Sequence, residues 1–113
     1  MSPLDLRHTD LRALRADLGF SQEALARALD VSARTVERWE GGAGPGAPEM
    51  LRRVDQLAEL ATLGREVYGV GLARFMTTPR RSLGHRTPAA SVIRGDIEEV
   101  MGILTQAYEG QWG

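Results

Sequence analysis

A cluster of helix-breaking residues near the middle of this chain limits how it can fold. Between residues 41 and 48 the sequence holds four glycines and two prolines, namely Gly41, Gly42, Gly44, Pro45, Gly46 and Pro48. Glycine loses the most conformational freedom in a helix, and proline lacks the backbone N–H that a helix interior needs. We therefore expect no regular element to continue through these residues, and Pro48 to be the first residue of a new helix.

The segment before this cluster predicts three short helices. Apolar residues recur at helical spacing over 10–18, which predicts the first helix. Ser21 and Ser32 are suitable N-caps for two further helices, and the third helix is expected to end near Glu40. Between these two helices, Asp30 is expected to take the left-handed backbone conformation of a tight turn, which aspartate tolerates. The side chains expected in the core are Leu11, Leu14, Leu18, Phe20, Leu25, Ala28, Leu29, Val36 and Trp39.

The segment after the cluster predicts a long helix, a break and further helices. The long helix covers 48–68 and stops at Gly69 and Gly71. Thr87 is expected to cap a brief helix, and a last amphipathic helix covers 96–110. The residues expected to be buried are Leu51, Val54, Ala58, Ala61 and Val67 in the long helix and Ile97, Val100, Met101, Leu104 and Tyr108 in the last one. No stretch alternates as a strand would, so the chain is predicted to be all-α.

Composition places the chain among folded globular proteins. Of its 113 residues, 42% are hydrophobic and 26% are charged, and its formal net charge is -1. The absence of cysteine excludes disulfides, thiolate metal sites and thiol nucleophiles. No apolar run approaches the roughly 18 residues of a membrane span, and residues 1–7 lack a signal-peptide pattern, so we expect a cytoplasmic protein without membrane contact. The near-zero net charge argues against a protein that only coats nucleic acid.

A helix-turn-helix pattern occupies residues 11–42. Its second helix begins with the polar run 21–23, and its third helix carries the charged residues Arg34, Glu37 and Arg38 and ends near a Trp-Glu-Gly sequence. These features, at these offsets, resemble the Cro/Xre-type repressors of bacteria and phages. The resemblance implies that the third helix enters the major groove of DNA while the second helix crosses the phosphate backbone. An ordinary three-helix bundle shares the apolar spacing but does not require the polar residues.

Two arginines of the third helix are the best candidates for base contacts. Arg34 and Arg38 lie off the apolar face, and a guanidinium offers a donor fork that matches guanine O6 and N7. Glu37 either accepts from cytosine N4 or, as we expect, holds one of these arginines in place. By resemblance, Gln22 contacts a phosphate or braces the recognition helix. The predicted DNA-binding residues are Gln22, Ser32, Ala33, Arg34, Thr35, Glu37 and Arg38. One such module buries too little surface for tight binding, so we expect a dimer on a palindromic site.

An arginine-rich stretch without acids lies in the second half of the chain. Residues 67–95 contain no aspartate or glutamate and five arginines, Arg74, Arg80, Arg81, Arg86 and Arg94. Such a stretch either faces an anionic partner or is neutralised within the chain by helix-end carbonyls and by acids such as Glu98 and Glu99. The sequence leaves both interpretations open.

A second motif covers residues 74–89 and the final helix. It holds an aromatic residue, a proline followed by a polar residue, a leucine, a second proline that opens a short helix, and an amphipathic helix ending at glycine. This order resembles the toxin-binding domain of the Xre/MbcA/ParS antitoxin family. Two positions depart from the family pattern, because Phe75 stands where tryptophan is usual and Arg80 where asparagine is usual. The two resemblances together imply a helix-turn-helix domain over 1–47, a connecting helix over 48–68 and a toxin-binding domain over 69–113.

The second resemblance implies a protein partner. It implies a RES-type toxin, an enzyme that destroys NAD and whose active site the antitoxin covers, while the antitoxin also represses its own operon. We expect a homodimer or a higher hetero-oligomer with the toxin, and no cofactor, metal or catalytic residue. Trp112 is either an apolar anchor for the toxin or part of a frayed tail. The predicted toxin-binding residues are Arg80, Arg81, His85, Arg86, Tyr108 and Trp112.

Other functional classes fit the sequence less well. The histidines His8 and His85 do not stand at a metal-ligand spacing, and the 69–71 Gly-Val-Gly run lacks the strand and the third glycine of a nucleotide-binding loop. An enzyme is therefore not expected. The main alternative is a stand-alone Xre-type repressor whose second half only dimerises or senses a ligand. A third possibility, an interaction module that no longer binds DNA, conflicts with the intact polar residues of the helix-turn-helix.

Overall fold

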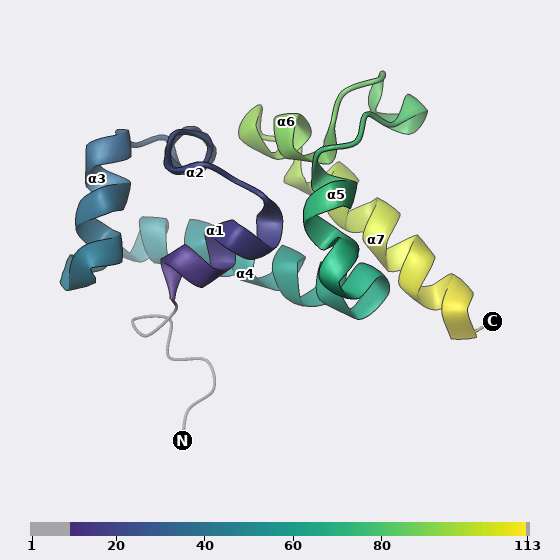
Figure 1. The fold of residues 1–113 in the computed structure, drawn as a ribbon, viewed down its shortest axis with the longest axis horizontal. Coiled ribbons are helices and arrows are strands. Elements are labelled where there is room, and N and C mark those ends of the chain that lie inside the picture. Colours follow the sequence, from purple (N-terminus) through teal and green to yellow (C-terminus); the bar gives the residue numbers. More distant parts are fainter. Residues whose placement is uncertain (1–9, 113) are drawn as a thin grey trace.

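The computed structural model describes residues 10–112 of the chain (Figure 1). Residues 1–9, which include His8, residue 113 and the side chain of Trp112 lie outside the described part. No β-strand occurs within 10–112, only an isolated bridge between Arg80 and Arg86, so the all-α prediction is confirmed. The elements are α1 (Leu11–Leu18), α2 (Gln22–Leu29), α3 (Ala33–Arg38), η2 (Trp39–Ala43), α4 (Pro48–Tyr68), η3 (Gly69–Gly71), α5 (Leu72–Met76), η4 (Arg81–Leu83), α6 (Pro88–Ile93) and α7 (Ile97–Trp112). Among the described helices, none combines the length and apolar character needed to cross a lipid bilayer.

The first three helices begin at capping side chains, of which Ser21 and Ser32 were predicted and Asp10 was not. Asp10, Ser21 and Ser32 each accept a hydrogen bond, at 3.0 to 3.1 Å, from a backbone N–H in the first turn of the helix that follows. Each such cap stabilises its helix by about 1 kcal/mol. Asp30 has the predicted left-handed backbone, with φ of 60°. The chain therefore turns tightly between α2 and α3 and sets the two helices across one another.

The third helix ends differently from the prediction. It passes into η2, a wide π-helical turn that includes Gly41 and Gly42, so the expectation that no regular element continues through these two glycines is wrong. The helical path is lost at Gly42, whose φ of 117° is accessible to glycine and to few other residues. The irregular linker is therefore shorter than expected, and Pro48 opens α4 as predicted.

The central helix, α4, buries more than the single stripe that periodicity predicts. It packs against α1, α2, α5 and α7, so side chains on several of its faces are enclosed. The predicted stripe is correct at Val54 and Ala61, which are buried, whereas three of its members are only half-buried and three other residues are buried instead. The half-buried members are Leu51, Ala58 and Val67, and the additional buried residues are Leu57, Leu60 and Gly64.

The last helix extends past its predicted end. It continues through Gly110 to Trp112 rather than stopping at Gly110. A glycine ends a helix when its backbone turns left-handed, and Gly110 is not among the glycines with positive φ. Val100 and Leu104 are buried, while Ile97, Met101 and Tyr108 are half-buried.

One hydrophobic core contains residues from both halves of the chain. Leu18 and Leu25 of the helix-turn-helix belong to the same cluster as Met76, Val92 and Leu104. The contacts that join them are those of α1 with α5 and of α2 with α6. The surface that presents α3 and the surface around α5 to α7 therefore share one packed interior.

Gly64 allows α4 and α5 to approach closely, because a Cβ atom at this position would overlap Cδ1 of the buried Leu72. We expect Gly64→Leu to lower the free energy of unfolding by about 2 kcal/mol, since overpacking a full core costs of that order. Urea unfolding followed by circular dichroism measures the change. Gly102→Leu on α7 is the matched control, because a Cβ there meets no atom within 4 Å. An equal response of the two variants would contradict this account.

Candidate functional site

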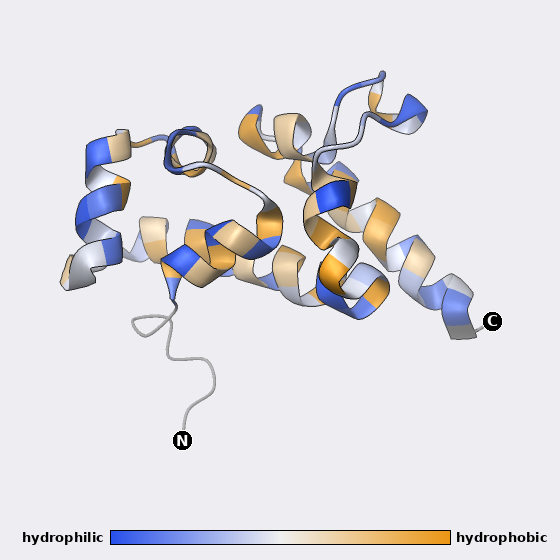
Figure 2. Ribbon diagram, viewed as in Figure 1, coloured by the Kyte–Doolittle hydropathy of each residue, from blue (hydrophilic) through white to orange (hydrophobic). Residues whose placement is uncertain are grey.

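Helix α3 presents a charged face to solvent (Figure 2). Val36 is buried and Trp39 packs against the core, which turns Arg34, Glu37 and Arg38 outward. No ion pair joins Glu37 to either arginine in the described part of the chain, so our expectation that Glu37 holds one of them is not met. Both guanidinium groups are thus available to another molecule.

The remaining predicted DNA-binding residues surround the start of α3. Ser32 is exposed, whereas Ala33 and Thr35 are half-buried. The hydroxyl oxygens of Ser32 and Thr35 lie 2.9 Å apart and share a hydrogen bond. This pair stabilises the first turn of α3, from which side chains of a recognition helix reach base edges.

A buried carboxylate connects the first helices of the chain. The side chain of Glu40, in η2, is 1% exposed, accepts a 2.7 Å hydrogen bond from Nε of Arg15 on α1, and accepts a 2.9 Å hydrogen bond from Nε2 of Gln22 on α2. Nε of Arg12 lies 3.8 Å away. Charged hydrogen bonds of this kind fix relative orientation as well as adding energy. Gln22 therefore braces the end of the recognition helix, which is one of the two roles expected for it.

The ionisation of this cluster follows from its contacts. The hydrogen bond from Arg15 lowers the pKa of Glu40 below its ordinary value of 4.5 and outweighs burial, which acts in the opposite direction. The same hydrogen bond raises the pKa of Arg15. Glu40 is therefore an anion wherever the protein is folded near neutral pH. Sequence reasoning missed Arg15 and Glu40, which are 25 positions apart; the acid next to the inward-facing Trp39 was the available signal.

The arginine-rich loop between α5 and α6 is held in one conformation. Leu83 is buried, the backbone N–H of Arg80 donates to the carbonyl of Arg86 at 3.0 Å, and the N–H of His85 donates to the carbonyl of Arg80 at 2.9 Å. Gly84 and His85 are both left-handed, with φ of 66° and 68°. A left-handed histidine is strained, and strain of this kind persists only where the surrounding contacts over-determine it. The loop is thus braced by its own backbone hydrogen bonds and by the buried Leu83.

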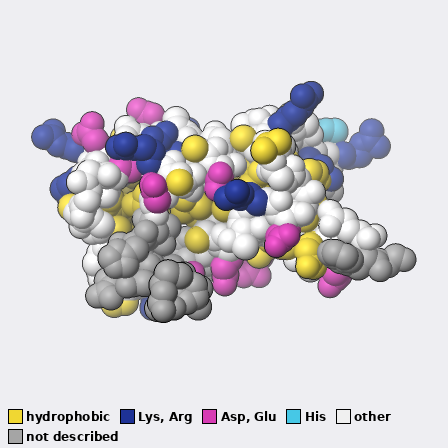
Figure 3. All heavy atoms as spheres, turned by 60° about the horizontal axis from the view of Figure 1, so that its bottom comes forward, with side chains coloured by type: hydrophobic (Ala, Val, Ile, Leu, Met, Phe, Trp, Pro, Cys, Tyr) yellow, Lys and Arg dark blue, Asp and Glu magenta, His cyan; other side chains and the backbone are white. Residues whose placement is uncertain are grey.

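The arginines of this region divide between the two interpretations that the sequence left open. Arg74, Arg81 and Arg86 are exposed, and within the part of the chain that the structure describes they form no ion pair. Arg94 is neutralised internally, as the second interpretation allows, by Asp96 at 2.9 Å. Figure 3 shows arginine side chains beside the histidine at one end of the molecule. The loop therefore carries an unmatched positive charge.

Unlike the exposed arginines of the loop, Arg80 is half-buried and contacts an aromatic ring. Its guanidinium carbon lies 5.3 Å from the centroid of the Phe75 ring, and Phe75 stacks on Tyr68 with centroids 4.7 Å apart. Cation–π contacts of this kind are worth about 0.5 to 2 kcal/mol. The Nε atom of Arg80 is buried without a hydrogen-bond partner, a polar group that folding leaves unsatisfied. Phe75 and Arg80, the two departures from the family pattern, are thus in direct contact with one another.

The two predicted surfaces lie at different ends of the molecule. Figure 1 places α3 at one end and the loop between α5 and α6, with the C-terminal end of α7, at the other. Tyr108 is half-buried on α7, and the backbone of Trp112 is in the last turn of that helix, while its side chain lies outside the described part. No cluster of three or more metal-ligating side chains is found among residues 10–112.

This chain is similar to known proteins both in sequence and in structure. A family described as a helix-turn-helix domain matches residues 9–67. The mycobacterial cidal antitoxins MbcA of Mycobacterium tuberculosis (strain ATCC 25618 / H37Rv) and of Mycobacterium bovis (strain ATCC BAA-935 / AF2122/97) are each 34% identical to this chain over 96 residues, which is 82% of this chain and 83% of theirs. The crystal structure of the M. tuberculosis MbcT-MbcA toxin-antitoxin complex is similar with a TM-score of 0.70 and 30% identity, covering 90% of this chain and 93% of that one. The chain therefore belongs to the MbcA family of antitoxins with an N-terminal helix-turn-helix domain.

Proposed function

We propose that this protein neutralises a RES-type, NAD-degrading toxin by covering its active site, and that it represses the operon encoding the pair. The observation that carries the proposal is the extent of the similarity to an antitoxin crystallised with its toxin, which covers 90% of this chain and 93% of that one. The relatives are antitoxins, and we propose a regulator without catalytic activity here as well.

The DNA-binding role is proposed for the exposed face of α3 and the start of α2. Arg34 and Arg38 supply donor forks for guanine, Ala33 contacts a thymine methyl group, and Glu37 accepts from cytosine N4. Gln22 donates one of its two side-chain N–H groups to Glu40 and so braces the recognition helix, which leaves the second N–H for a phosphate. A homodimer places two such helices on a palindromic operator.

The toxin-binding role is proposed for the loop between α5 and α6 and for the end of α7. Arg81, Arg86 and His85 are exposed on a loop braced by backbone hydrogen bonds, which lowers the entropy lost on binding. The unmatched charge of the two arginines suits an acidic rim on the partner. Arg80 stabilises the loop through its contact with the ring of Phe75. Tyr108 and Trp112 on α7 are proposed to provide aromatic contact area.

Co-expression tests the proposal. The product of the neighbouring gene should arrest growth and lower cellular NAD when it is made alone, and should be harmless and form a stable complex when it is made with this protein. The protein would instead be a stand-alone repressor if its affinity for its own promoter rises steeply as the salt concentration falls, while it neither rescues growth nor forms a complex.

Reversing the charge of the loop should weaken toxin binding. For Arg81→Glu/Arg86→Glu we expect the association rate with the toxin to fall by about 10-fold or more at low salt and less at high salt, because rim charges act mainly on encounter. Stopped-flow or surface plasmon resonance measures the rate. Arg52→Glu is the control, since Arg52 is exposed on α4 and forms no ion pair within residues 10–112. If the control and the double variant slow equally, the loop is not the toxin surface.

A further inference from the structure

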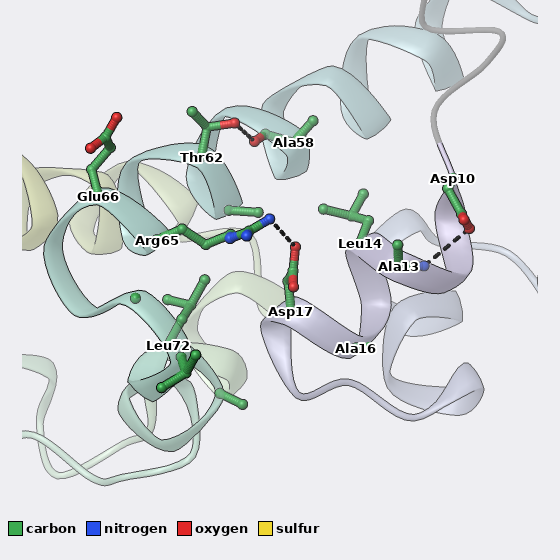
Figure 4. A pocket seen from close by; sticks show the side chains of 14 residues that line it. Asp10, Ala13, Leu14, Ala16, Asp17, Ala58, Thr62, Arg65, Glu66 and Leu72 are labelled. Carbon is green, nitrogen blue, oxygen red and sulfur yellow. Dashed lines mark hydrogen bonds and ion pairs between the residues drawn. The ribbon is translucent and has the colours of Figure 1, made fainter.

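Two hollows in the described part of the chain differ in the charge of their linings. The larger is a groove of about 830 Å³ between α1 and the second half of α4, and it ends beside the exposed Val70 (Figure 4). Three acids and one arginine line this groove, and the arginine, Arg65, donates a 3.4 Å hydrogen bond to one of the acids, Asp17. A lining in which acids outnumber bases disfavours anions.

The smaller hollow is a pocket of about 380 Å³ between α2, α4, α6 and the start of α7. Figure 1 shows α6 next to α2, and the two helices are in contact. The charged residues that line the pocket are Arg27 in the last turn of α2, Asp30 in the turn that follows, Arg53 on α4 and Arg94 at the end of α6. Its lining therefore has an excess of two positive charges, opposite in sign to the groove.

The three guanidinium groups of the pocket retain N–H donors for a ligand. Within residues 10–112, Arg27 forms no hydrogen bond or ion pair. Nη1 of Arg53 donates to the backbone carbonyl of Leu29 at 3.1 Å, which holds this side chain against the end of α2. Nε of Arg94 pairs with Asp96 at 2.9 Å. Because a guanidinium carries five N–H groups, these contacts leave further donors on each arginine.

The acids that pair with these arginines from outside the lining hold them weakly. The side chain of Asp96 is 36% exposed, and that of Glu49, whose Oε2 lies 3.9 Å from Nη2 of Arg53, is 74% exposed. Exposed ion pairs of this kind contribute about 1 kcal/mol or less. An anion with two charges that reaches all three arginines is therefore able to displace these acids.

The pocket also has an apolar surface. Leu57 and Val92, which line it, are buried, and Ile93 and Ile97 are half-buried. A bare inorganic anion leaves these side chains in contact with water, whereas an organic group covers them. The volume of the pocket lies within the range of about 300 to 1,000 Å³ that is usual for small-molecule sites.

We propose that this pocket binds a small phosphate monoester with an apolar group, and that Arg27, Arg53 and Arg94 hold its phosphate. A phosphate monoester carries about -1.5 to -2 charges at neutral pH, which matches the excess positive charge of the lining. The planar guanidinium fork suits two oxygens of one phosphate. The apolar group of the ester covers the leucine, valine and isoleucine side chains.

This ligand site is separate from the DNA and toxin surfaces proposed above. No residue of α3 or of the loop between α5 and α6 lines the pocket. Arg27 belongs to the helix-turn-helix and Arg94 to the second half of the chain, so one bound phosphate joins the two halves. Binding should therefore raise the unfolding temperature, because the ligand binds the folded chain alone.

Calorimetric titration of the full chain with phenyl phosphate tests the site. We expect one site per chain with a dissociation constant below about 1 mM at low salt, at least about 10-fold weaker binding of inorganic phosphate, and no binding of phenol. The weaker binding of inorganic phosphate reflects the missing apolar contact. A chain that binds neither phosphate compound, or that binds both equally, would overturn the proposal.

Substitutions locate the binding in the pocket. Arg27→Gln should raise the dissociation constant for phenyl phosphate by about 10-fold, because a charged hydrogen-bond donor is lost. Asp96→Asn should lower the constant, since it removes the carboxylate that competes for Arg94. Arg74→Gln is the matched control, because Arg74 is exposed, lies outside the pocket and loses the same charge. Circular dichroism establishes that the variants are folded. Equal weakening by Arg27→Gln and Arg74→Gln would show that binding follows net charge and would overturn the site.

A phosphate of the DNA backbone is the other source of the same chemistry, and competition separates the two. The titration is repeated with the chain saturated by a short duplex of random sequence at low salt. The affinity for phenyl phosphate should be unchanged, because a backbone phosphodiester carries one charge and brings no apolar group into the pocket. Loss of phenyl phosphate binding in the presence of the duplex would assign the pocket to the DNA backbone and overturn the proposal of a small ligand.

Discussion

Replacing Glu40 with glutamine should lower the free energy of unfolding by about 2 to 3 kcal/mol, the range expected for hydrogen bonds to a charged group. Glutamine keeps the shape of the side chain but removes the charge that Arg15 faces at 2.7 Å. The side chain of Arg15 is only 22% exposed, so its charge is left partly buried without a counterion. Because Gln22 also donates to Glu40, the change loosens the contact of α2 with the end of the recognition helix.

The pH dependence of the unfolding free energy shows whether the lost charge causes the destabilisation by Glu40→Gln. The pKa of Glu40 in the folded state lies below its ordinary value of 4.5, so its contribution to stability is fully present above pH 4.5 and is lost as the pH falls through the folded value. The wild type and Glu40→Gln should therefore differ most at neutral pH and converge in acid. Urea unfolding across this range measures the difference. Glu59→Gln, an exposed carboxylate on α4, is the control and should change stability little. A gap that persists undiminished in acid would show that shape, not charge, accounts for the effect.

Replacing Arg34 and Arg38 together with alanine should abolish specific binding to the promoter of the operon. Each bidentate arginine-to-guanine contact is worth about 1 to 3 kcal/mol of discrimination, and a dimer would lose each contact twice. Because α3 is held by its own cap and by the Glu40 cluster, and neither arginine takes part in these contacts, the double variant should remain folded.

The measurement compares two DNA fragments, the promoter and a random sequence of equal length. Fluorescence anisotropy at a stated salt concentration should show a large loss on the promoter and a small one on the random fragment. Arg52→Ala is the control on α4. An equal loss on both fragments would make these arginines phosphate contacts, and the slope of affinity against salt would then fall by about one unit for each contact removed.

Much of the fold could be predicted because its signals are local. Ser21, Ser32 and Thr87 cap helices at the positions expected from their hydroxyl groups, and Asp30 turns left-handed as expected. A cap or a turn depends on residues three or four positions apart, which periodicity and residue type specify directly. The errors lie where a helix meets several neighbours, as in α4, or where no local rule applies, as at Gly110.

The site was predicted in part. The outward face of α3 follows from two inward residues, Val36 and Trp39, so their spacing indicates Arg34 and Arg38. The Glu40 cluster joins α1, α2 and η2 through polar side chains, and the periodicity of apolar residues does not predict such contacts. The same holds for Arg80, whose contact with Phe75 depends on how the loop folds back over α5.

The sequence alone was enough to predict the helices, the residues at which they start and the tight turn, because these depend on short-range conformational preferences. It was also enough to identify the family that the chain resembles, because the family motifs are continuous in the sequence. Only the tertiary structure shows that Glu40 is buried between Arg15 and Gln22. It also shows that Arg94 pairs with Asp96 whereas Arg81 and Arg86 form no ion pair among the described residues. Finally, it shows that Val70 is exposed beside a groove. These outcomes depend on which surfaces come together when one core is enclosed by helices from both halves of the chain, and distance in space is not encoded by distance along the sequence.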